Sequence, residues 1–294
     1  MQLLCYISDE DSSKYKDWSL KRTITPECDR TICGITAIDS MLYVISQDSK
    51  DISVYSATGF VFLKTVTIDR LINPNDIGSC KFNHCLYICD WSTALIFRVK
   101  VSEEIEQINW STDKDLGCLS VTDEHTILRA GYLSSKVKEY TSDGELIRSI
   151  ELENDFKPWH AIKLGGINTH FVICQGGNSK PCHRVCLIDI NGKVQNSFGG
   201  VAGSDKEHLC GPYHLAVDKS GCIYVNDCNN SRILLLSQDL KFIKEIVHSS
   251  SNILRRARRM HLDEVAGRLY VADNARTDSG TKDGRILVFS NSYA

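Results

Sequence analysis

The chain repeats one short, β-rich unit along nearly its whole length, and this repeat constrains the fold more than any other feature. The clearest copy spans residues 211–247 and holds four apolar runs, at 215–217, 223–225, 233–236 and 242–247. Short turns rich in Gly, Asn, Asp and Ser separate the runs, as is typical of strands joined by hairpins. No run is long enough for a helix. The unit is therefore predicted to be a four-stranded antiparallel meander.

The second run of this unit occurs six times. It starts at Leu42, Leu86, Ile127, Phe171, Ile223 and Leu269, which gives spacings of 44, 41, 44, 52 and 46 residues. A single meander with two apolar faces cannot bury both of them alone. A four-strand unit with a period of about 45 residues is typical of a β-propeller blade. The sequence therefore predicts an all-β protein, a six-bladed β-propeller of four-stranded antiparallel blades.

Six blades use almost all of the 294 residues, so we expect one domain over residues 1–294. The expected blades cover about 30–70, 71–112, 115–153, 156–200, 208–248 and 254–293. The sixth blade lacks a fourth run after Phe289, whereas residues 18–25 have the pattern of a strand without a partner. We expect residues 18–25 to close the ring as the outer strand of the sixth blade, because closure removes an exposed sheet edge.

Motifs in the repeat resemble a known family. The sequence Pro-x-His-Leu-Ala-Val-Asp begins at Pro212, Gly-x-Ile-Tyr-Val-x-Asp ends at Asp227, and Asn-x-Arg-Ile contains Arg232. Together they resemble the NHL repeat, and the resemblance covers nearly the whole chain. It implies a six-bladed propeller like the C-terminal domain of tripartite-motif (TRIM-NHL) ubiquitin ligases and Brat-type translational repressors. The third blade departs from the pattern, because Gly131 stands where an Asp is expected.

The composition limits the cellular compartment and the classes of binding partner that we expect for the protein. The formal net charge is −3, so any nucleic-acid contact must rest on a local basic patch. No apolar run is long enough to cross a membrane, and the N-terminal sequence lacks the basic start of a signal peptide. The 13 cysteines include no CxxC pair, and many fall in or beside strands. We expect a cytoplasmic, monomeric protein that binds neither a membrane nor a dinucleotide cofactor.

The loops that lead into the innermost strands of a propeller meet at one end of its central channel. The side chains expected there, counted from a repeated proline or from a later Asp, are Asp76, His160, His214, Arg259, Trp159 and Tyr213. Cys118 and Ile35 are their expected counterparts in the third and first blades. Polar groups with aromatic neighbours at a concave surface indicate a binding site. We therefore predict a ligand site at this channel mouth.

A cluster of arginines precedes the sixth blade. Arg255, Arg256 and Arg258 stand beside Arg259 in the sequence Arg-Arg-Ala-Arg-Arg. Guanidinium groups bind phosphate and carboxylate alike, so we predict that the first three also contact the ligand. Some NHL propellers that resemble this chain bind single-stranded RNA on this face, by stacking and charge. The alternative is a solvated basic loop balanced by nearby acidic residues.

The favoured function is a non-catalytic recognition or scaffold module for a protein or single-stranded RNA, without a cofactor. Within tripartite-motif ligases such a propeller would recognise the substrate. The alternative is a metal-assisted lyase or hydrolase, in which His160, His214 and His261 hold Zn²⁺ and lower the pKa of bound water. Six-bladed lyases that split peptidyl-hydroxyglycine are similar in repeat and use such a metal.

Overall fold

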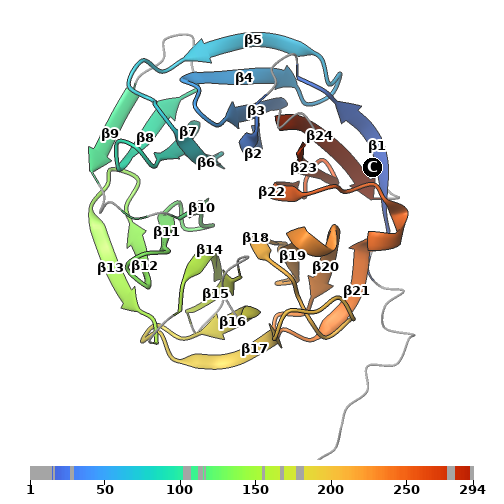
Figure 1. Cartoon of the computed structure of the whole chain (residues 1–294). Coiled ribbons are helices and arrows are strands. Elements are labelled where there is room, and N and C mark those ends of the chain that lie inside the picture. The colour runs from blue at the N-terminus through green and yellow to red at the C-terminus, as the bar shows by residue number, and fades with distance from the viewer. Residues whose placement is uncertain are drawn as a thin grey trace, which may run out of the picture.

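The computed structural model describes residues 15, 17–26, 30–101, 107–111, 115, 117–153, 156–165, 169–176, 182–276 and 282–291. Within these ranges the chain forms six four-stranded antiparallel sheets. The sheets are arranged as blades around a central channel, with each innermost strand beside the channel and each outermost strand on the rim of the ring (Figure 1). The predicted six-bladed β-propeller is confirmed. No helix in the described part is long and apolar enough to span a membrane.

The strands follow the blades in chain order. Blade 1 holds β2 (Ile32–Ile38), β3 (Met41–Ser46), β4 (Asp51–Ser56) and β5 (Phe62–Thr67); blade 2 holds β6 (Pro74–Cys80), β7 (Cys85–Asp90), β8 (Leu95–Lys100) and β9 (Gln107–Ser111). Blade 3 holds β10 (Leu119–Val121), β11 (Ile127–Gly131), β12 (Lys136–Tyr140) and β13 (Leu146–Glu151); blade 4 holds β14 (Pro158–Leu164), β15 (His170–Gln175), β16 (His183–Ile188) and β17 (Val194–Gly200). Blade 5 holds β18 (Pro212–Val217), β19 (Ile223–Asp227), β20 (Arg232–Leu236) and β21 (Phe242–Val247); blade 6 holds β22 (Ala257–Asp263), β23 (Arg268–Arg276), β24 (Lys282–Asn291) and the N-terminal β1 (Trp18–Ile24). Two short 3₁₀ helices, η2 (Cys228–Asn230) and η3 (Ser249–Ser251), lie in loops.

The N-terminal strand closes the ring, as the sequence predicts. Strand β1 pairs antiparallel with β24, from Trp18 opposite Asn291 to Ile24 opposite Ile286. The Trp18 ring also meets Tyr224 of blade 5 edge-to-face, with ring centroids 6.1 Å apart. The first described strand of the chain therefore completes the last blade and contacts the blade before it.

The hydrophobic core lies in the seams between neighbouring blades. Strands β3, β7 and β20 are almost wholly buried, whereas the outermost strand β5 is largely exposed. One apolar cluster joins blades 1 and 2 through residues such as Ile45 and Phe97, and another joins blades 4 and 5 through Val185 and Leu234. Each blade thus covers the apolar face of the next, as the repeat requires.

An Asp at the end of the second strand fixes the loop that leads into each of several blades. The carboxylate of Asp90 accepts the backbone N–H groups of Ile72 and Asn73, both at 2.7 Å. Asp273 accepts those of Arg255 and Arg256 at 3.0 and 2.7 Å. These loops carry the residues of the channel mouth, so the repeated Asp positions the candidate site.

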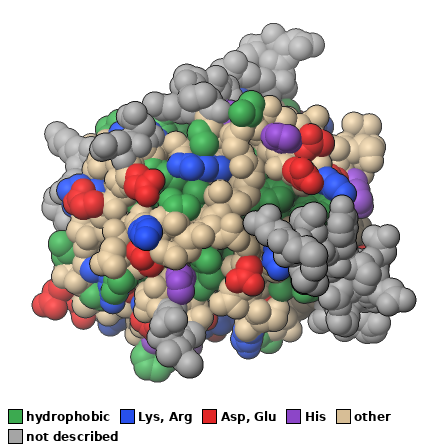
Figure 2. All heavy atoms as spheres, turned by 90° about the horizontal axis from the view of Figure 1, so that it is seen from below, with side chains coloured by type: hydrophobic (Ala, Val, Ile, Leu, Met, Phe, Trp, Pro, Cys, Tyr) green, Lys and Arg blue, Asp and Glu red, His purple; other side chains and the backbone are tan. Residues whose placement is uncertain are grey.

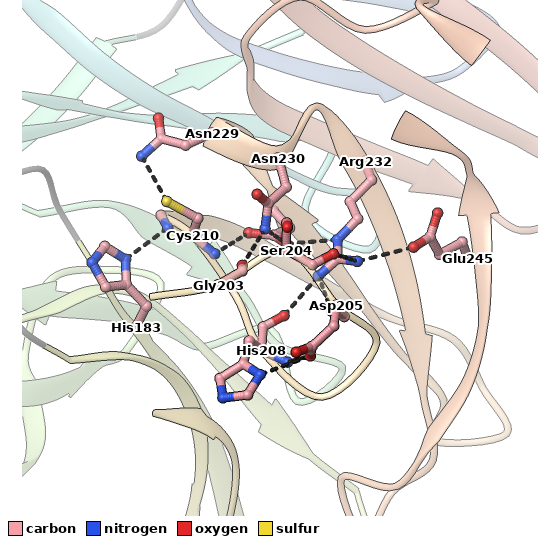
Figure 3. Close-up of polar contacts among 12 residues, drawn as sticks. His183, Gly203, Ser204, Asp205, His208, Cys210, Asn229, Asn230, Arg232 and Glu245 are labelled. Atoms are coloured by element: carbon pink, nitrogen blue, oxygen red, sulfur yellow. Dashed lines mark hydrogen bonds and ion pairs between the residues drawn. The ribbon is translucent and has the colours of Figure 1, made fainter. Parts of the chain in front are cut away.

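Blade 5 has the most complete version of this device (Figure 3). Buried Arg232 forms an ion pair with Asp227 at 2.8 Å, and Asp227 accepts the backbone N–H of Cys210 at 2.7 Å. The remaining donors of Arg232 reach Glu245 and the backbone carbonyls of Ser204, Asp205 and His208. The contact between Asp227 and Arg232 crosses the β19–β20 hairpin and holds the long loop before blade 5 in place.

In blade 3 the carboxylate comes from the loop and not from the end of the second strand. At Gly131, where the Asp is missing, a Cβ atom would come within 2.5 Å of a carboxylate oxygen of Asp115. Asp115, from the preceding loop, accepts the backbone N–H groups of Leu133 and Ser134 at 2.5 and 2.8 Å. The glycine therefore makes room for a carboxylate that the loop itself supplies.

Candidate binding site at the channel mouth

A cavity of about 190 Å³ opens at the end of the channel where the loops before the innermost strands meet. It is lined by residues from five blades, namely Thr31, Cys33, Gln47, Asn73, Pro74, Asn75, Trp91, Trp159, Tyr213, Arg258 and Arg259. This volume suits one or two side chains and is smaller than the pocket of a typical drug-sized ligand.

A β-bulge aims one residue of each of five innermost strands at this cavity. The strand registers shift at the second residue, between Pro74 and Asp76 in blade 2 and between Ala257 and Arg259 in blade 6. The bulged residues are Cys33, Asn75, Trp159, Tyr213 and Arg258, and all five line the cavity. A bulge re-aims side chains in this way. It separates the residues that face the mouth from those that face the channel interior.

Aromatic side chains form one wall of the mouth. The rings of Tyr132 and Trp159 lie 4.5 Å apart, and those of Trp159 and Tyr213 lie 5.2 Å apart. The indole N–H of Trp159 donates to the carbonyl of Gly176, and that of Trp91 donates to the carbonyl of Gly117 at 3.4 Å. The aromatic wall (Tyr132, Trp159 and Tyr213) is therefore held in place before any ligand arrives.

Four buried polar residues close the channel beneath the mouth, and we call them the belt: Asp76, His160, His214 and Arg259. The guanidinium Nε of Arg259 lies 3.2 Å from Asp76 Oδ1, and its Nη2 donates to the backbone carbonyl of Asn75 at 3.0 Å. Asp76 also accepts the backbone N–H groups of Ile77 and Leu119 at 3.0 and 3.2 Å. The carboxylate is thus fully engaged.

The two histidines of the belt stack on each other, with ring centroids 3.9 Å apart. His160 Nδ1 accepts the backbone N–H of Leu215 at 3.3 Å, which assigns the ring proton to Nε2. Nε2 then donates to the carbonyl of Leu119 at 3.2 Å. His160 is therefore neutral and bridges blades 3 and 5. His214 Nε2 lies 3.7 Å from Asp76 Oδ2, and its Nδ1 is buried without a hydrogen-bond partner.

Burial and charge set the protonation of the belt. Burial lowers the pKa of His160 and of His214 below the usual value, and the Arg259 charge lowers both further. Burial alone would raise the pKa of Asp76, but the charge of Arg259 and the contact with His214 lower it overall. At neutral pH the belt is one carboxylate, one guanidinium and two neutral imidazoles.

Two residues of the belt, His160 and His214, are also predicted metal ligands in the alternative function, together with His261. Ligand atoms of Asp76, His160 and His214 lie within 4.8 Å of one another, the only such group of three found among the described residues. The donors do not fit a cation, however, because both ring nitrogens of His160 are used and Arg259 already neutralises the carboxylate. His261 does not belong to the group. Its Nδ1 lies 3.2 Å from Thr36 Oγ1, beside a cavity that also contains Ser79 and Ser120.

The arginine cluster divides into three environments. Exposed Arg255 pairs with Asp283 at 2.8 Å, and buried Arg259 belongs to the belt. Arg256 and Arg258 are half-buried, and no ion pair joins either of them to an acid in the described ranges. Two nearby acids that could have balanced the loop, Asp263 and Glu264, have other partners. Asp263 pairs with Lys81, for example.

Two features of the site were not predicted from the sequence. The first-blade counterpart of Asp76 is Gly34 and not Ile35, because Gly34 follows the bulged Cys33 as Asp76 follows the bulged Asn75. Tyr132 was missed as a wall residue. It follows Gly131 as Trp91 follows Asp90, but Cys228 and Asn274 stand at this position in blades 5 and 6, so the position alone carries no aromatic signal.

Comparisons with known proteins support the β-propeller fold and identify no family. No protein-family model and no curated protein sequence match the chain. Virginiamycin B lyase from Staphylococcus aureus is similar in structure, with 11% identity, a TM-score of 0.61, and coverage of 93% of this chain and 99% of that one. A streptogramin B lyase structure has 10% identity and a TM-score of 0.62 over 94% of this chain and 98% of that one. Kuenenia stuttgartiensis hydrazine synthase has 13% identity and a TM-score of 0.62 over 92% and 98%. At such identities the likeness shows the propeller fold alone.

Proposed function

We propose that the chain is a recognition propeller that binds a segment of a protein partner at the channel mouth. The observation that carries the proposal is the aromatic wall above the belt, where Arg259 and backbone N–H groups already bind the carboxylate of Asp76. Pre-positioned Trp and Tyr rings are typical anchors of protein interfaces. Because Asp76 and His160 are engaged in internal contacts, they are poorly placed to perform acid–base or metal chemistry.

A protein segment fits the mouth better than single-stranded RNA does. Only Arg256 and Arg258 of the arginine cluster lack acidic partners in the described part of the chain, whereas RNA binding draws on many phosphate contacts. Figure 2, which views the ring from its side and not from the mouth, shows basic and acidic side chains interspersed on that side. The cavity also has the volume of a side chain or two.

We further propose that the propeller is of the NHL type, on the strength of the motifs around Pro212, Asp227 and Arg232. In a tripartite-motif ligase such a domain would select the substrate. Membership of that kind would be consistent with a cytoplasmic, monomeric protein, and the described cysteines are free thiols that are mostly buried.

A selection with a displayed peptide library against the full chain tests the main proposal. Selected peptides should bind at least about tenfold more weakly to a Trp159→Ala variant, because aromatic anchors dominate such interfaces. Phe82→Ala is the matched control, since Phe82 is an exposed aromatic, 72% accessible, in the β6–β7 hairpin away from the mouth lining. Fluorescence polarisation measures both affinities. Equal binding to wild type and Trp159→Ala would refute a mouth site.

Two parallel measurements address the other candidates. An RNA selection that yields tight, strongly salt-dependent binders, when the peptide library yields none, would replace the protein partner by RNA. The metal-assisted lyase remains the second candidate, because two of the similar structures are lyases. Elemental analysis of untagged protein tests it. Near-stoichiometric zinc that disappears in a His160→Ala/His214→Ala variant would favour the enzyme.

A further inference from the structure

Arg256 and Arg258 form a pair of like charges at the seam between blades 5 and 6. Arg256 directly precedes β22, and Arg258 is the bulged residue of that strand. Both are half-buried, and the Nε atom of each is enclosed without a hydrogen-bond partner. Burial, followed by the charge of Arg256, lowers the pKa of Arg258. Two cations held in this way are unfavourable unless an anion joins them.

The neighbours of this arginine pair are polar but neutral. Tyr213 of the aromatic wall and the buried Cys228 lie close enough for the two arginine charges to affect their pKa values. Burial, the largest cause, raises the pKa of Cys228 to about 11, so its thiol carries no negative charge at neutral pH. Cys228 shares a side-chain hydrogen bond with Arg256, and no acidic side chain among the described residues forms an ion pair with either arginine.

The same loop supplies a contrast. Arg255 is adjacent in sequence, is exposed, and has its own carboxylate partner in Asp283. Asp273 does not neutralise the arginine pair either, because its oxygens accept backbone N–H groups of the loop and bind Arg285. The nearby carboxylates therefore bind backbone N–H groups and other arginines. Arg256 and Arg258 lie beside the aromatic wall without an acidic partner among the described residues.

We propose that Arg256 and Arg258 form an oxyanion subsite of the channel mouth, which takes a carboxylate or phosphate group carried by the bound peptide. This inference rests on the proposed function for the identity of the ligand. Two planar guanidinium forks match both oxyanions, and a charge-assisted hydrogen bond is stronger than a neutral one. The partner segment would then present an acidic or phosphorylated side chain next to an aromatic or apolar one that stacks on the wall.

Small anions test the subsite without any peptide. The probes are inorganic phosphate and acetate, added at constant ionic strength, and the readout is the melting temperature. Phosphate, acetate or both should raise the melting temperature of wild type and of Arg255→Gln, and neither should raise that of the Arg256→Gln/Arg258→Gln double variant. Without a probe, the double variant should melt at the wild-type temperature or above it. Equal stabilisation of all three proteins, no stabilisation of wild type, or a markedly lower melting temperature of the double variant would each overturn the subsite.

Peptides from the selection then distinguish this inference from the proposed function. Replacing the acidic residue of a selected peptide by its amide should weaken binding to wild type about tenfold and leave binding to the double variant unchanged. Matched peptides with aspartate or phosphoserine separate the carboxylate from the phosphate. Peptides that depend on Trp159 but bind the double variant as tightly as wild type would overturn the subsite and leave the recognition function standing.

Discussion

Arg258 and Arg259 are neighbours in the chain, yet they belong to two regions with opposite character. Arg259 lies in the belt, where Asp76 and the carbonyl of Asn75 engage its guanidinium group. Arg258 lies at the mouth, half-buried beside Arg256, and no acid pairs with it among the described residues. The bulge in β22 separates them. The comparison teaches that residue type alone does not identify a functional arginine; what matters is whether its hydrogen bonds and charge are already satisfied.

The largest effect is expected from breaking the belt. Asp76→Ala leaves the buried Arg259 without its carboxylate, which should lower the free energy of unfolding by about 3–5 kcal/mol. Denaturant titration measures this loss. Asp69→Ala is the control, because Asp69 forms an exposed pair with Lys50, and it should leave stability nearly unchanged.

A double variant tells whether the loss comes from the stranded charge. Replacing both members, as Asp76→Leu/Arg259→Met, removes the uncompensated cation and should destabilise less than Asp76→Ala does. If Asp76→Ala lowers the free energy of unfolding as little as Asp69→Ala does, the ion pair of Asp76 with Arg259 does not stabilise the belt. The contrast between a satisfied Arg259 and an unsatisfied Arg258 would then be wrong.

A smaller effect is expected from acid, and it also belongs to the belt. The folded-state pKa values of His160 and His214 lie below the unfolded value of about 6.5, because burial disfavours the imidazolium. The unfolded chain therefore binds more protons, and stability is lost as pH falls below about 6.5. Each histidine contributes up to about 1.4 kcal/mol per pH unit. His261 adds to the loss, since burial lowers its pKa to about 4.

Denaturant titrations from pH 7.5 to pH 4.5 measure this slope. His160→Gln keeps a donor and an acceptor but cannot titrate, so it should flatten the profile between pH 6.5 and 4.5. His84→Gln, at an exposed histidine outside the belt, is the matched control. A wild-type profile that is flat over this range would mean that the belt histidines are not held neutral.

The sequence was sufficient for the architecture because the repeat is encoded locally. An apolar run that recurs about every 45 residues predicts the six blades, and the missing fourth run after Phe289 indicates that residues 18–25 close the ring. Each of these inferences depends on neighbours along the chain.

The site was only partly predictable, because its geometry depends on the bulges and on contacts between distant blades. The proline-based alignment found Asp76, His160 and His214, and the structure brings them together. It could not show that His160 has both ring nitrogens bound by Leu119 and Leu215, some 41 and 55 residues away. The alignment also could not show that Arg258 faces the mouth while Arg259 belongs to the belt, because the one-residue bulge between them has no evident sequence signal.

The smallest effect is expected at the mouth, and it has the opposite sign. Arg256→Glu converts the like-charge pair into an ion pair with Arg258, so the free energy of unfolding should rise by about 0.5–1 kcal/mol at low salt. Arg255→Glu is the matched change in the same loop. It replaces the pair with Asp283 by two like charges and should lower stability slightly. Both changes should shrink in 0.5 M salt, by screening. If Arg256→Glu loses more stability than Arg255→Glu, the fold needs Arg256 as a cation. The claim that the arginines of the mouth, unlike Arg259 of the belt, have no stabilising ionic partner would then be wrong.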